Sequence, residues 1–324
     1  MKAKLLFCLA CVLTLWACAP AARMEAENDL LYYIAEGQAV VAGYLGSGCA
    51  AEIPPSLGGA PVMKIASQAF QNTDLQRLGL PAGLARIGSW AFGYCQRLEG
   101  IDLPASLTGI GYGAFYACGL TAATLPAGLA ELGDWAFAHC EHLRQISLPA
   151  GLTRIGDSVF CGCAALSGIT LPANLRSIGD HAFGGCLSLT AIELPRGLRS
   201  IGSFAFQGCA GLKTVAVPAS VAFIDEDAFL DCENVSFMVE PGSYAMRFAQ
   251  KNGIPYQLTG LRPGDVSGDG QVDIQDVIRL LKLVSGWDVQ VLAAGCDVTG
   301  DGSINMMDVI RLLKYVSGWD VRLE

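Results

Sequence analysis

Residues 189–209 read LTAIELPRGLRSIGSFAFQGC, and copies of this pattern fill the middle of the chain. Between residues 75 and 232 the pattern recurs with a period of 23 residues, once of 22, and its consensus is L-x-x-I-x-L-P-x-x-L-x-x-I-G-x-x-A-F-x-x-C. One copy cannot bury its own apolar residues, whereas a stack of copies buries them continuously. The pattern therefore predicts a solenoid, with one coil for each copy.

Three conserved columns of the consensus mark the successive coils. They are Pro81, Pro104, Pro126, Pro149, Pro172, Pro195 and Pro218; Phe92, Phe115, Phe137, Phe160, Phe183, Phe206 and Phe229; and Cys95, Cys118, Cys140, Cys163, Cys186, Cys209 and Cys232. A period of 20–29 residues with leucine at these intervals is typical of leucine-rich repeats. Over residues 30–258 the chain closely resembles the BspA-like bacterial surface proteins. That resemblance implies an N-terminal cap over residues 33–53 and a closing helix over residues 242–256.

Two short acidic loops follow the repeats, DVSGDGQVDIQD at 265–276 and DVTGDGSINMMD at 297–308. Each has oxygen-bearing side chains at loop positions 1, 3, 5, 9 and 12 and glycine at position 6, which is the ligand spacing of an EF-hand calcium loop. Ca²⁺ takes six to eight oxygens, and a 12-residue loop surrounds one ion only if position 6 bends sharply. Gly270 and Gly302 permit that bend because they have no Cβ. The predicted ligands, with backbone carbonyls at position 7, are Asp265, Ser267, Asp269, Gln271, Asp273, Asp276, Asp297, Thr299, Asp301, Ser303, Asn305 and Asp308.

A nearly identical segment follows each loop, and the two copies are offset by 32 residues. Val277, Leu280, Leu281 and Val284 recur at the spacing of one helix face, as do their counterparts in the second copy. Gly286 and Gly318 stand where a C-cap glycine belongs. The sequence therefore predicts two loop–helix units. No full helix precedes either loop, because residues 259–264 have the composition of a linker, and position 12 is Asp instead of the usual Glu.

These two departures from an ordinary EF-hand make residues 259–324 resemble a type I dockerin, a duplicated calcium module that docks onto cohesin domains. The resemblance implies two bound Ca²⁺ ions and a cohesin-bearing scaffold protein as partner. The alternative is a generic pair of calcium loops. In the dockerin family, loop positions 10 and 11 and basic residues further along each helix contact cohesin. Here these are Ile274, Gln275, Arg279, Lys282, Met306, Met307, Arg311 and Lys314.

The chain has thirteen cysteines, and seven of them form the cysteine column of the repeats. Stacked coils place neighbouring thiols about 5 Å apart, a separation that by itself permits disulfides. However, parallel stacked side chains point the same way, and a free cysteine packs as a small hydrophobic residue. We therefore predict a reduced, structural ladder of thiols.

Length and composition limit the organisation and the partners. The 324 residues are 52% hydrophobic and 16% charged, which suits two packed domains. The net charge of −9 and the lack of a basic stripe argue against nucleic acid as a partner. The loop carboxylates repel one another without metal, so calcium binding is expected to be coupled to folding.

The first residues read as a secretory signal. Lys2 and Lys4 precede an apolar stretch of residues 5–16 that is too short to span a bilayer. Cleavage before Ala22 and lipoprotein processing at Cys18 are both open. No second hydrophobic span follows, so we predict a secreted protein without a transmembrane span. The predicted domains are a signal peptide (1–21), a capped solenoid (22–258) and a dockerin (259–324).

No catalytic site is predicted. The three histidines, His139, His142 and His181, occupy different columns of the repeat. Acidic residues recur along the solenoid without the facing pair of carboxylates that a glycosidase needs. The sequence therefore does not predict an enzyme.

Exposed residues of the solenoid offer two candidate surfaces. The concave strand positions are small or polar: Asp102, Thr124, Ser147, Thr170 and Glu193. Aromatic residues gather elsewhere, and their columns hold Trp90, Trp135, His181 and Phe204 in one and Tyr94 and His139 in another. Sugar-binding surfaces use such rings, but we predict that these rings cover the flank of the solenoid.

Together these patterns predict an α+β chain, a leucine-rich-repeat solenoid followed by a small all-α dockerin. The predicted function is that of a secreted, non-catalytic interaction protein. Its solenoid would present a recognition surface to an unknown protein or glycan, and its dockerin would attach it to a scaffold as in a cellulosome. Two alternatives remain, an accessory component that binds carbohydrate or assists polysaccharide degradation, and a cell-surface adhesin anchored through Cys18.

Overall fold

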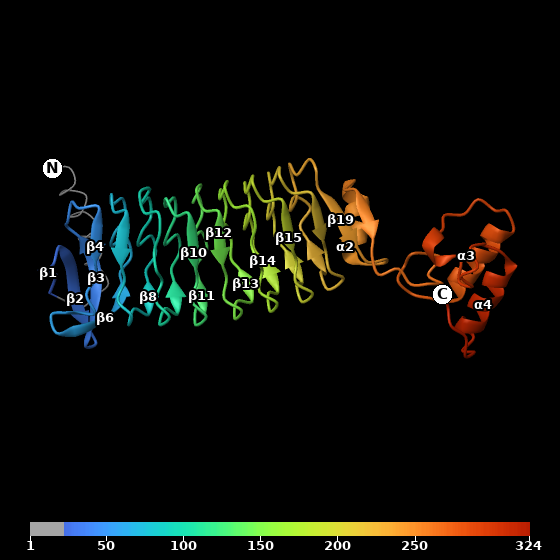
Figure 1. Cartoon of the computed structure of the whole chain (residues 1–324), viewed down its shortest axis with the longest axis horizontal. Coiled ribbons are helices and arrows are strands. Elements are labelled where there is room, and N and C mark those ends of the chain that lie inside the picture. Colours follow the sequence, from blue (N-terminus) through green and yellow to red (C-terminus); the bar gives the residue numbers. More distant parts are fainter. Residues whose placement is uncertain (1–22) are drawn as a thin grey trace. The chain divides into compact units, whose positions relative to one another are not determined.

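The structure is a computed structural model that describes residues 23–324 (Figure 1). The predicted signal peptide, including Cys18, lies outside the described residues. The chain divides into two compact units. The first runs to Lys213 and includes Asp225–Asn234, and the second comprises Thr214–Ile224 and Val235–Glu324. In the described part, no helix is long and apolar enough to cross a membrane.

An antiparallel meander caps the first unit and overlaps only in part with the cap expected over residues 33–53, because it begins earlier. Its strands are β1 (Glu25–Glu27), β2 (Leu30–Ala35) and β3 (Gln38–Tyr44), and β3 then pairs in parallel with β6 (Ala60–Ile65). The short β5 (Ser56–Leu57) pairs with β6 as a hairpin. Leu30, Tyr32 and Val41 are buried and close the end of the core.

Successive coils stack beyond this cap and place their short parallel strands in two rows on different faces, and these rows divide into several separate sheets (Figure 1). One sheet runs from β6 through β8 (Arg86–Ile87) and β9 (Gly109–Ile110) to β11 (Glu131–Leu132), and β13 (Arg154–Ile155), β14 (Ser177–Ile178) and β16 (Ser200–Ile201) pair in the same way. The other face holds β4 (Ala50–Glu52), β7 (Arg77–Gly79), β10 (Ala122–Thr124), β12 (Gln145–Ser147) and β15 (Ala191–Glu193), where β4 pairs with β7 and β10 with β12. The solenoid of leucine-rich repeats predicted from the sequence is confirmed.

A ladder of phenylalanines runs through the core of the coils. Phe70, Phe92, Phe115, Phe137, Phe160, Phe183, Phe206 and Phe229 stack ring on ring with neighbouring centroids 5.0–6.0 Å apart. All eight are buried. Burial of each ring contributes about 1.5–3 kcal/mol, and each stacked pair adds about 0.5–1.5 kcal/mol. Phe70 belongs to a coil ahead of the repeats recognised in the sequence.

The cysteine column forms a second ladder beside the phenylalanines. Each thiol donates a hydrogen bond of 2.9–3.3 Å to the carbonyl of the phenylalanine one coil earlier, from Cys95 to Phe70 through to Cys232 and Phe206. The same carbonyls also accept a backbone N–H, as Phe92 O does from Cys95 N at 3.1 Å. The interpretation of these cysteines as small hydrophobic residues was therefore incomplete, because each thiol also links two coils.

The ten cysteines within residues 23–324 are all free. Burial raises the pKa of Cys140 to about 12 and that of Cys209 to about 12. Burial raises the pKa of Cys232 to about 11. These thiols therefore stay protonated at neutral pH.

One face of the solenoid is interrupted at the coil that carries Asp102. Residues 99–103 form no strand although β7 and β10 occupy the same position in neighbouring coils, and residues 168–170 are reduced to a single bridge between Ser147 and Thr170. In these two coils the first strand position is Gly100 or Gly168, and glycine weakens a strand. The expectation that Asp102 lies on a strand is therefore wrong, and Thr170 makes only that bridge.

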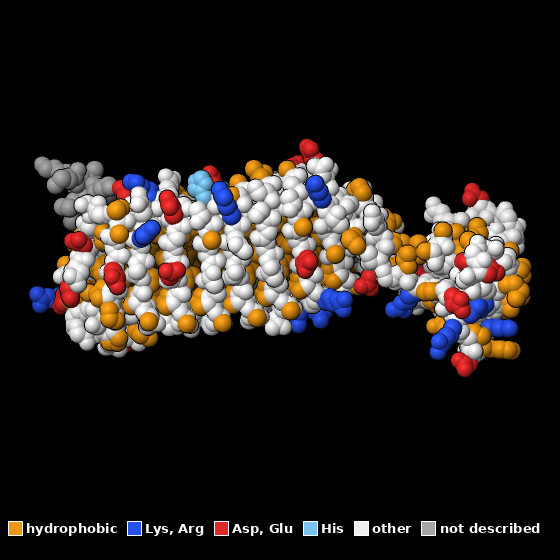
Figure 2. Space-filling view, in the orientation of Figure 1, with side chains coloured by type: hydrophobic (Ala, Val, Ile, Leu, Met, Phe, Trp, Pro, Cys, Tyr) orange, Lys and Arg blue, Asp and Glu red, His pale blue; other side chains and the backbone are white. Residues whose placement is uncertain are grey.

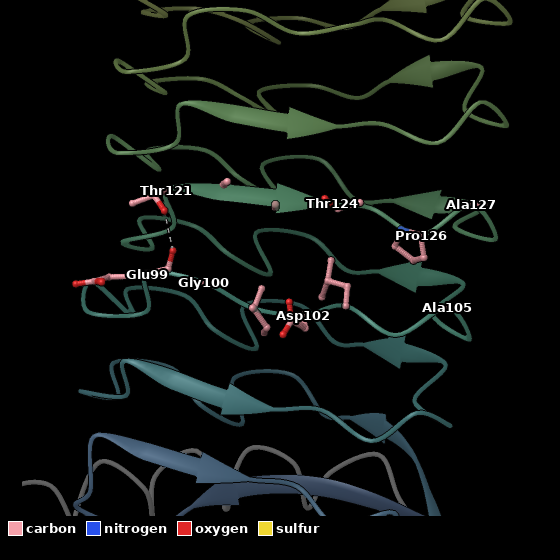
Figure 3. A pocket seen from close by; sticks show the side chains of 12 residues that line it. Glu99, Gly100, Asp102, Ala105, Thr121, Thr124, Pro126 and Ala127 are labelled. Atoms are coloured by element: carbon pink, nitrogen blue, oxygen red, sulfur yellow. Dashed lines mark hydrogen bonds between the residues drawn. The ribbon is translucent and has the colours of Figure 1, made fainter.

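The coil that follows the one with Asp102 is one residue shorter, because only Gly119 separates Cys118 from Leu120. Thr121 reaches back to Glu99, whose carbonyl accepts its N–H at 3.0 Å and its hydroxyl at 3.2 Å (Figure 3). A hollow of about 550 Å³ opens between the two coils and is lined by Glu99, Asp102, Thr121 and Thr124 among others (Figure 3). This hollow contains the exposed carboxylates of Glu99 and Asp102, which belong to the same coil.

The second unit contains the last strands of the solenoid and its closing helix. β17 (Thr214–Ala216), β19 (Ser236–Val239) and β20 (Tyr256–Leu258) pair in parallel, and β18 (Phe223–Ile224) lies in the same unit. Helix α2 (Tyr244–Asn252) begins at Ser243, whose hydroxyl accepts the N–H of Met246, and ends at Gly253 with φ 67°. It lies within the range where the family resemblance places a closing helix.

The C-terminal segment forms two helices around a small core of its own. They are α3 (Ile274–Val284) and α4 (Met306–Val316), with the 3₁₀ turn η1 (Ala293–Gly295) between them. Val277, Leu280, Val309 and Leu312 from the helices pack together with Val266, Cys296 and Val298 from the loops. The predicted duplicated loop–helix arrangement is confirmed.

The short coil yields a test of backbone packing at Gly119. An alanine Cβ there would collide with the carbonyl oxygen of Gln96, whereas Gly151 has open space around its Cβ position. Gly119→Ala is expected to lower the free energy of unfolding by about 1–3 kcal/mol, the usual range for overpacking. Gly151→Ala is the matched control and should leave the denaturation midpoint unchanged. Equal midpoints for the two variants would contradict this account.

The buried thiols predict both labelling and pH behaviour. At pH 8 a maleimide should modify Cys49, which is exposed, while the ladder thiols react only on unfolding. Below about pH 9 the thiols of Cys140 and Cys209, whose pKa is raised to about 12 by burial, are protonated in both states. Above it these thiols ionise first in the unfolded chain, so their contribution to stability should fall progressively up to about pH 12. Cys140→Ala should make this fall less steep in pH-dependent denaturation, and ladder labelling as fast as that of Cys49 in the native protein would contradict the prediction.

Candidate metal centre: the duplicated acidic loops

Position 1 of each loop organises the backbone that follows it. Asp265 is fully buried, and its carboxylate accepts N–H groups from Gly268 at 2.8 Å, Asp269 at 3.1 Å and Gly270 at 2.9 Å. Asp297 likewise accepts the N–H groups of Gly300 and Gly302 at 2.8 Å. One carboxylate thus fixes the turn in each loop.

Glycines supply the backbone conformations that this turn requires. Gly270 and Gly302, the position 6 residues identified from the sequence, have φ of 86° and 82°. Gly268 and Gly300 at position 4 also have positive φ, 75° and 71°. The calcium-loop pattern drew attention to position 6 alone, although the repeated glycine at position 4 was visible in both copies.

Position 12 connects each loop to its helix. Asp276 accepts the N–H groups of Ser267 and Asp273 at 2.8 Å, and Asp308 accepts those of Thr299 at 3.0 Å and Asn305 at 2.9 Å. Asp273 and Asn305 are the N-caps, so each loop ends in a reciprocal capping box. Aspartate has the shorter side chain that such a compact arrangement needs.

The electrostatics of position 12 depend on these hydrogen bonds. Burial opposes ionisation of Asp308, but hydrogen bonds from the Asn305 N–H and from the hydroxyl and N–H of Thr299 hold the pKa of Asp308 below its usual value. Asp265, Asp276 and Asp308 are fully buried. No ion pair with Lys or Arg involves them among residues 23–324. Each loop therefore concentrates negative charge that no neighbouring side chain neutralises.

The donors suit a hard cation, because every predicted side-chain ligand offers oxygen. The carboxylates point toward backbone N–H groups, and within the described residues no group of three or more Asp, Glu, His or Cys side chains lies close enough to hold a metal ion. The loops thus offer the oxygen donors that Ca²⁺ takes.

The predicted partner contacts divide into two kinds. Ile274, Met306 and Met307 are 47%, 45% and 60% exposed, and Gln275, Lys282 and Lys314 are exposed as well. Arg279 instead donates to the carbonyl of Gln290 at 3.0 Å. Arg311 donates to the carbonyl of Arg322 at 2.7 Å and pairs with Glu324. The two arginines thus hold the segments that follow their own helices.

Other exposed apolar residues, on the two helices and directly after them, were missed. Ile278 and Ile310, and Leu281 and Leu313, are 39–43% exposed, although Leu281 was assigned to the apolar stripe. Trp287 and Trp319 are both 64% exposed, with the ammonium groups of Lys282 and Lys314 5.9 and 5.7 Å from their ring centroids. The exact repetition of these residues in the two copies was the signal available in the sequence.

His139 and His181 lie in different surroundings on the solenoid. His139 packs edge-on against Tyr116, whereas His181 stacks on Phe204 with centroids 4.9 Å apart.

Family comparisons agree with this geometry. The BspA type leucine rich repeat region matches in six copies over residues 63–186 and 153–245, which together are more than half of the chain. The chain belongs to the BspA-type leucine-rich repeat family. Residues 263–317 match the dockerin type I domain. Dockerins bind cohesins, so this BspA-type protein combines an interaction solenoid with an attachment module of the cellulosomal kind.

Solved structures share the fold of this BspA-type protein. A leucine-rich repeat protein from Bacteroides ovatus is 24% identical, with 72% of this chain and 76% of that chain covered and a TM-score of 0.51. One from Eubacterium ventriosum is 21% identical, with 65% of this chain covered and a TM-score of 0.50. The match spans half of the Eubacterium protein. No curated protein matches the chain.

Proposed function

We propose that the protein is secreted and non-catalytic, with a signal peptide (1–21), a recognition solenoid (22–258) and a dockerin (259–324) that attaches it to a cohesin-bearing scaffold. The single observation that carries this proposal is the duplicated loop–helix unit, in which both copies expose apolar residues at matching positions. A surface of this kind on a small module fits a partner better than solvent. Leucine-rich repeats and dockerins are families of non-catalytic modules, which supports the absence of an enzymatic role.

Each acidic loop would hold one Ca²⁺ ion. We assign the ligands by the loop positions 1, 3, 5, 7, 9 and 12, so that position 7 contributes its backbone carbonyl. The buried and unpaired charge of Asp265, Asp276 and Asp308 supports this assignment. Bound calcium supplies positive charge that offsets the repulsion among the carboxylates. The chain's own hydrogen bonds from positions 4 and 6 pre-shape each loop.

Cohesin would dock on the exposed face shared by α3 and α4. Ile274 and Met306 begin the two helices, and Lys282 and Lys314 lie about two turns further along each of them. The apolar residues provide the buried centre of an interface and the lysines its polar rim. Because the two copies offer nearly the same residues, the dockerin could bind in two orientations, with either copy as the main contact.

Calorimetry on the full chain tests the metal assignment. Two Ca²⁺ ions are expected to bind, and Asp265→Ala with Asp297→Ala should abolish both sites, because each change removes a ligand and the acceptor that shapes its loop. Asp288→Ala with Asp320→Ala is the matched control, since these exposed aspartates lie outside the loops. A stoichiometry of zero for the native chain, or unchanged binding by the loop variant, would refute the assignment.

Binding to a panel of immobilised cohesin domains tests the docking surface. Ile274→Asp alone should weaken binding roughly twofold, because one of two equivalent orientations remains. Adding Met306→Asp should weaken it by about 30-fold or more, the loss expected from a buried contact of about 2 kcal/mol.

Leu187→Asp, a charge placed on an exposed leucine of the solenoid, is the control for this series. Complete loss from Ile274→Asp alone would establish a single orientation. Unchanged binding by the double variant would place the interface elsewhere, and calcium stoichiometry measured on each variant shows whether its loops are intact.

A further inference from the structure

Six rings from three successive coils meet on the surface of the solenoid. Trp90 lies 6.1 Å from Tyr94, 5.8 Å from Tyr112 and 5.0 Å from Tyr116 between ring centroids. Tyr116 continues the contact to Trp135 at 6.2 Å and His139 at 5.2 Å. We call Trp90, Tyr94, Tyr112, Tyr116, Trp135 and His139 the aromatic cluster. The columns seen in the sequence contained four of these residues, and the structure adds Tyr112 and Tyr116, which join them.

The core of the solenoid does not require this cluster. The phenylalanine ladder fills the interior of every coil from Phe70 to Phe229, whereas aromatic residues occupy the cluster columns in only some coils. At the position of Trp90 the next coil has Gly113, and at the position of His139 later coils have Gly162 and Gly185. Coils without these rings thus form the same stack.

The backbone at four of the six rings is in a conformation that large side chains avoid. Trp90, Tyr94, Trp135 and His139 have φ of 58°, 64°, 62° and 58°. Left-handed backbone is uncommon for residues other than glycine and costs of the order of a kcal/mol or more. These columns keep the left-handed backbone in other coils too, with φ of 52° at Ala117 and 55° at Phe204. Glycine fits such a position with the least strain, so the fold itself gives no preference for a large ring there.

The rings are held firmly and remain accessible. The indole of Trp90 lies against Gly113, where a Cβ would come within 3.1 Å of it, and the His139 ring lies as closely over Gly162. Tyr94 and Tyr112 are 41% and 43% exposed. A surface whose rings are fixed before binding loses little conformational entropy when a ligand arrives.

Hydrogen-bonding groups continue from the cluster along the coils. Asp134 precedes Trp135, and Arg154 lies 3.7 Å from the Asp134 carboxylate and 3.0 Å from that of Asp157. All three side chains are 38–54% exposed. Planar carboxylate and guanidinium groups can each bind two neighbouring hydroxyls. An apolar platform thus adjoins a polar strip.

We propose that the aromatic cluster binds a neutral, linear polysaccharide, with sugar rings stacked on Trp90, Tyr94 and Tyr112 and hydroxyls bound by Asp134, Arg154 and Asp157. The C–H bonds on the face of a pyranose carry slight positive charge and meet the negative face of an aromatic ring. A polymer suits a site that extends over several coils. This inference rests on the proposed role of the solenoid as a recognition surface, and it is independent of what the dockerin binds.

Other ligands fit the observations less well. Nucleic acid also stacks on aromatic rings, but it needs a positively charged groove, and the chain has a net charge of −9. On the face shown in Figure 2, charges of both signs are scattered over the solenoid instead of gathered in a basic stripe. A proline-rich peptide docks into an aromatic-lined groove, whereas Tyr94 and Tyr112 are exposed on the surface.

Affinity electrophoresis of the full chain through gels containing hydroxyethyl cellulose, xyloglucan, xylan or galactomannan tests the proposal. EDTA in the gel keeps calcium-dependent docking out of the measurement. At least one of these neutral polymers should retard the native chain. Tyr94→Gly and Tyr112→Ser should bind it about tenfold more weakly or worse.

Two features make the test specific for binding. Tyr94→Gly introduces the residue that the same column has at Gly162, so the thermal midpoint of this variant should not fall. If the Tyr94 ring had only a structural role, its removal would lower that midpoint. Phe204→Gly is the matched control, because Phe204 shares the column and the backbone conformation of Trp90 but stacks on His181, and it should be retarded like the native chain.

Three results would overturn the proposal. They are no retardation of the native chain by any of the four polymers, retardation of the Tyr94 and Tyr112 variants equal to that of the native chain, or a loss of retardation in Phe204→Gly equal to that in the tyrosine variants. Cohesin binding of the same variants in calcium should be unchanged. If the native chain does not bind cohesin in calcium, the proposed role of the dockerin is wrong, but the result of the polysaccharide experiment is unaffected.

Discussion

The spacing between parallel strands controls the rest of the solenoid. Neighbouring strands lie about 4.8 Å apart, so any residue type that recurs once per coil is brought against its own copies. The phenylalanine centroids follow that spacing at 5.0–6.0 Å, and the thiols span it by donating to the carbonyl one coil earlier. The same spacing brings the surface rings within 5–6 Å of one another. Core, thiol ladder and aromatic cluster are therefore three results of one constraint.

Because the repeat imposes columns, a large part of the solenoid could be predicted from the sequence. A single period established the phenylalanine and cysteine columns and the stacking of coils. Features that depend on neighbouring columns were less accessible. The thiol hydrogen bonds require the direction of the Phe137 carbonyl relative to Cys163, which no spacing reveals. Tyr112 and Tyr116 occupy columns without other aromatic residues, so only the folded chain shows that they join Trp90 to Trp135.

Local chemistry explains where the strand prediction failed. Asp102 follows the consensus, yet its coil forms no strand, because Gly100 weakens the pairing. A consensus averages over coils, whereas strand pairing depends on the residues of each coil. In the dockerin, likewise, the ligand spacing and the capping residues were evident from the sequence. The exposure of Leu281 was not, because a helix with a single helical neighbour buries only part of its apolar face.

Differences between coils separate the residues that the fold needs from those that it tolerates. Phenylalanine occupies the core column in every coil from Phe70 to Phe229, since a missing ring would leave a cavity that stacking cannot close. The columns of Trp90 and Tyr94 vary from coil to coil and include glycine, serine, alanine and aspartate as well as rings, and the stack is preserved throughout. A large ring in left-handed backbone costs conformational energy that glycine avoids. The fold therefore does not require rings at these columns, and a repeat protein shows this contrast within a single chain.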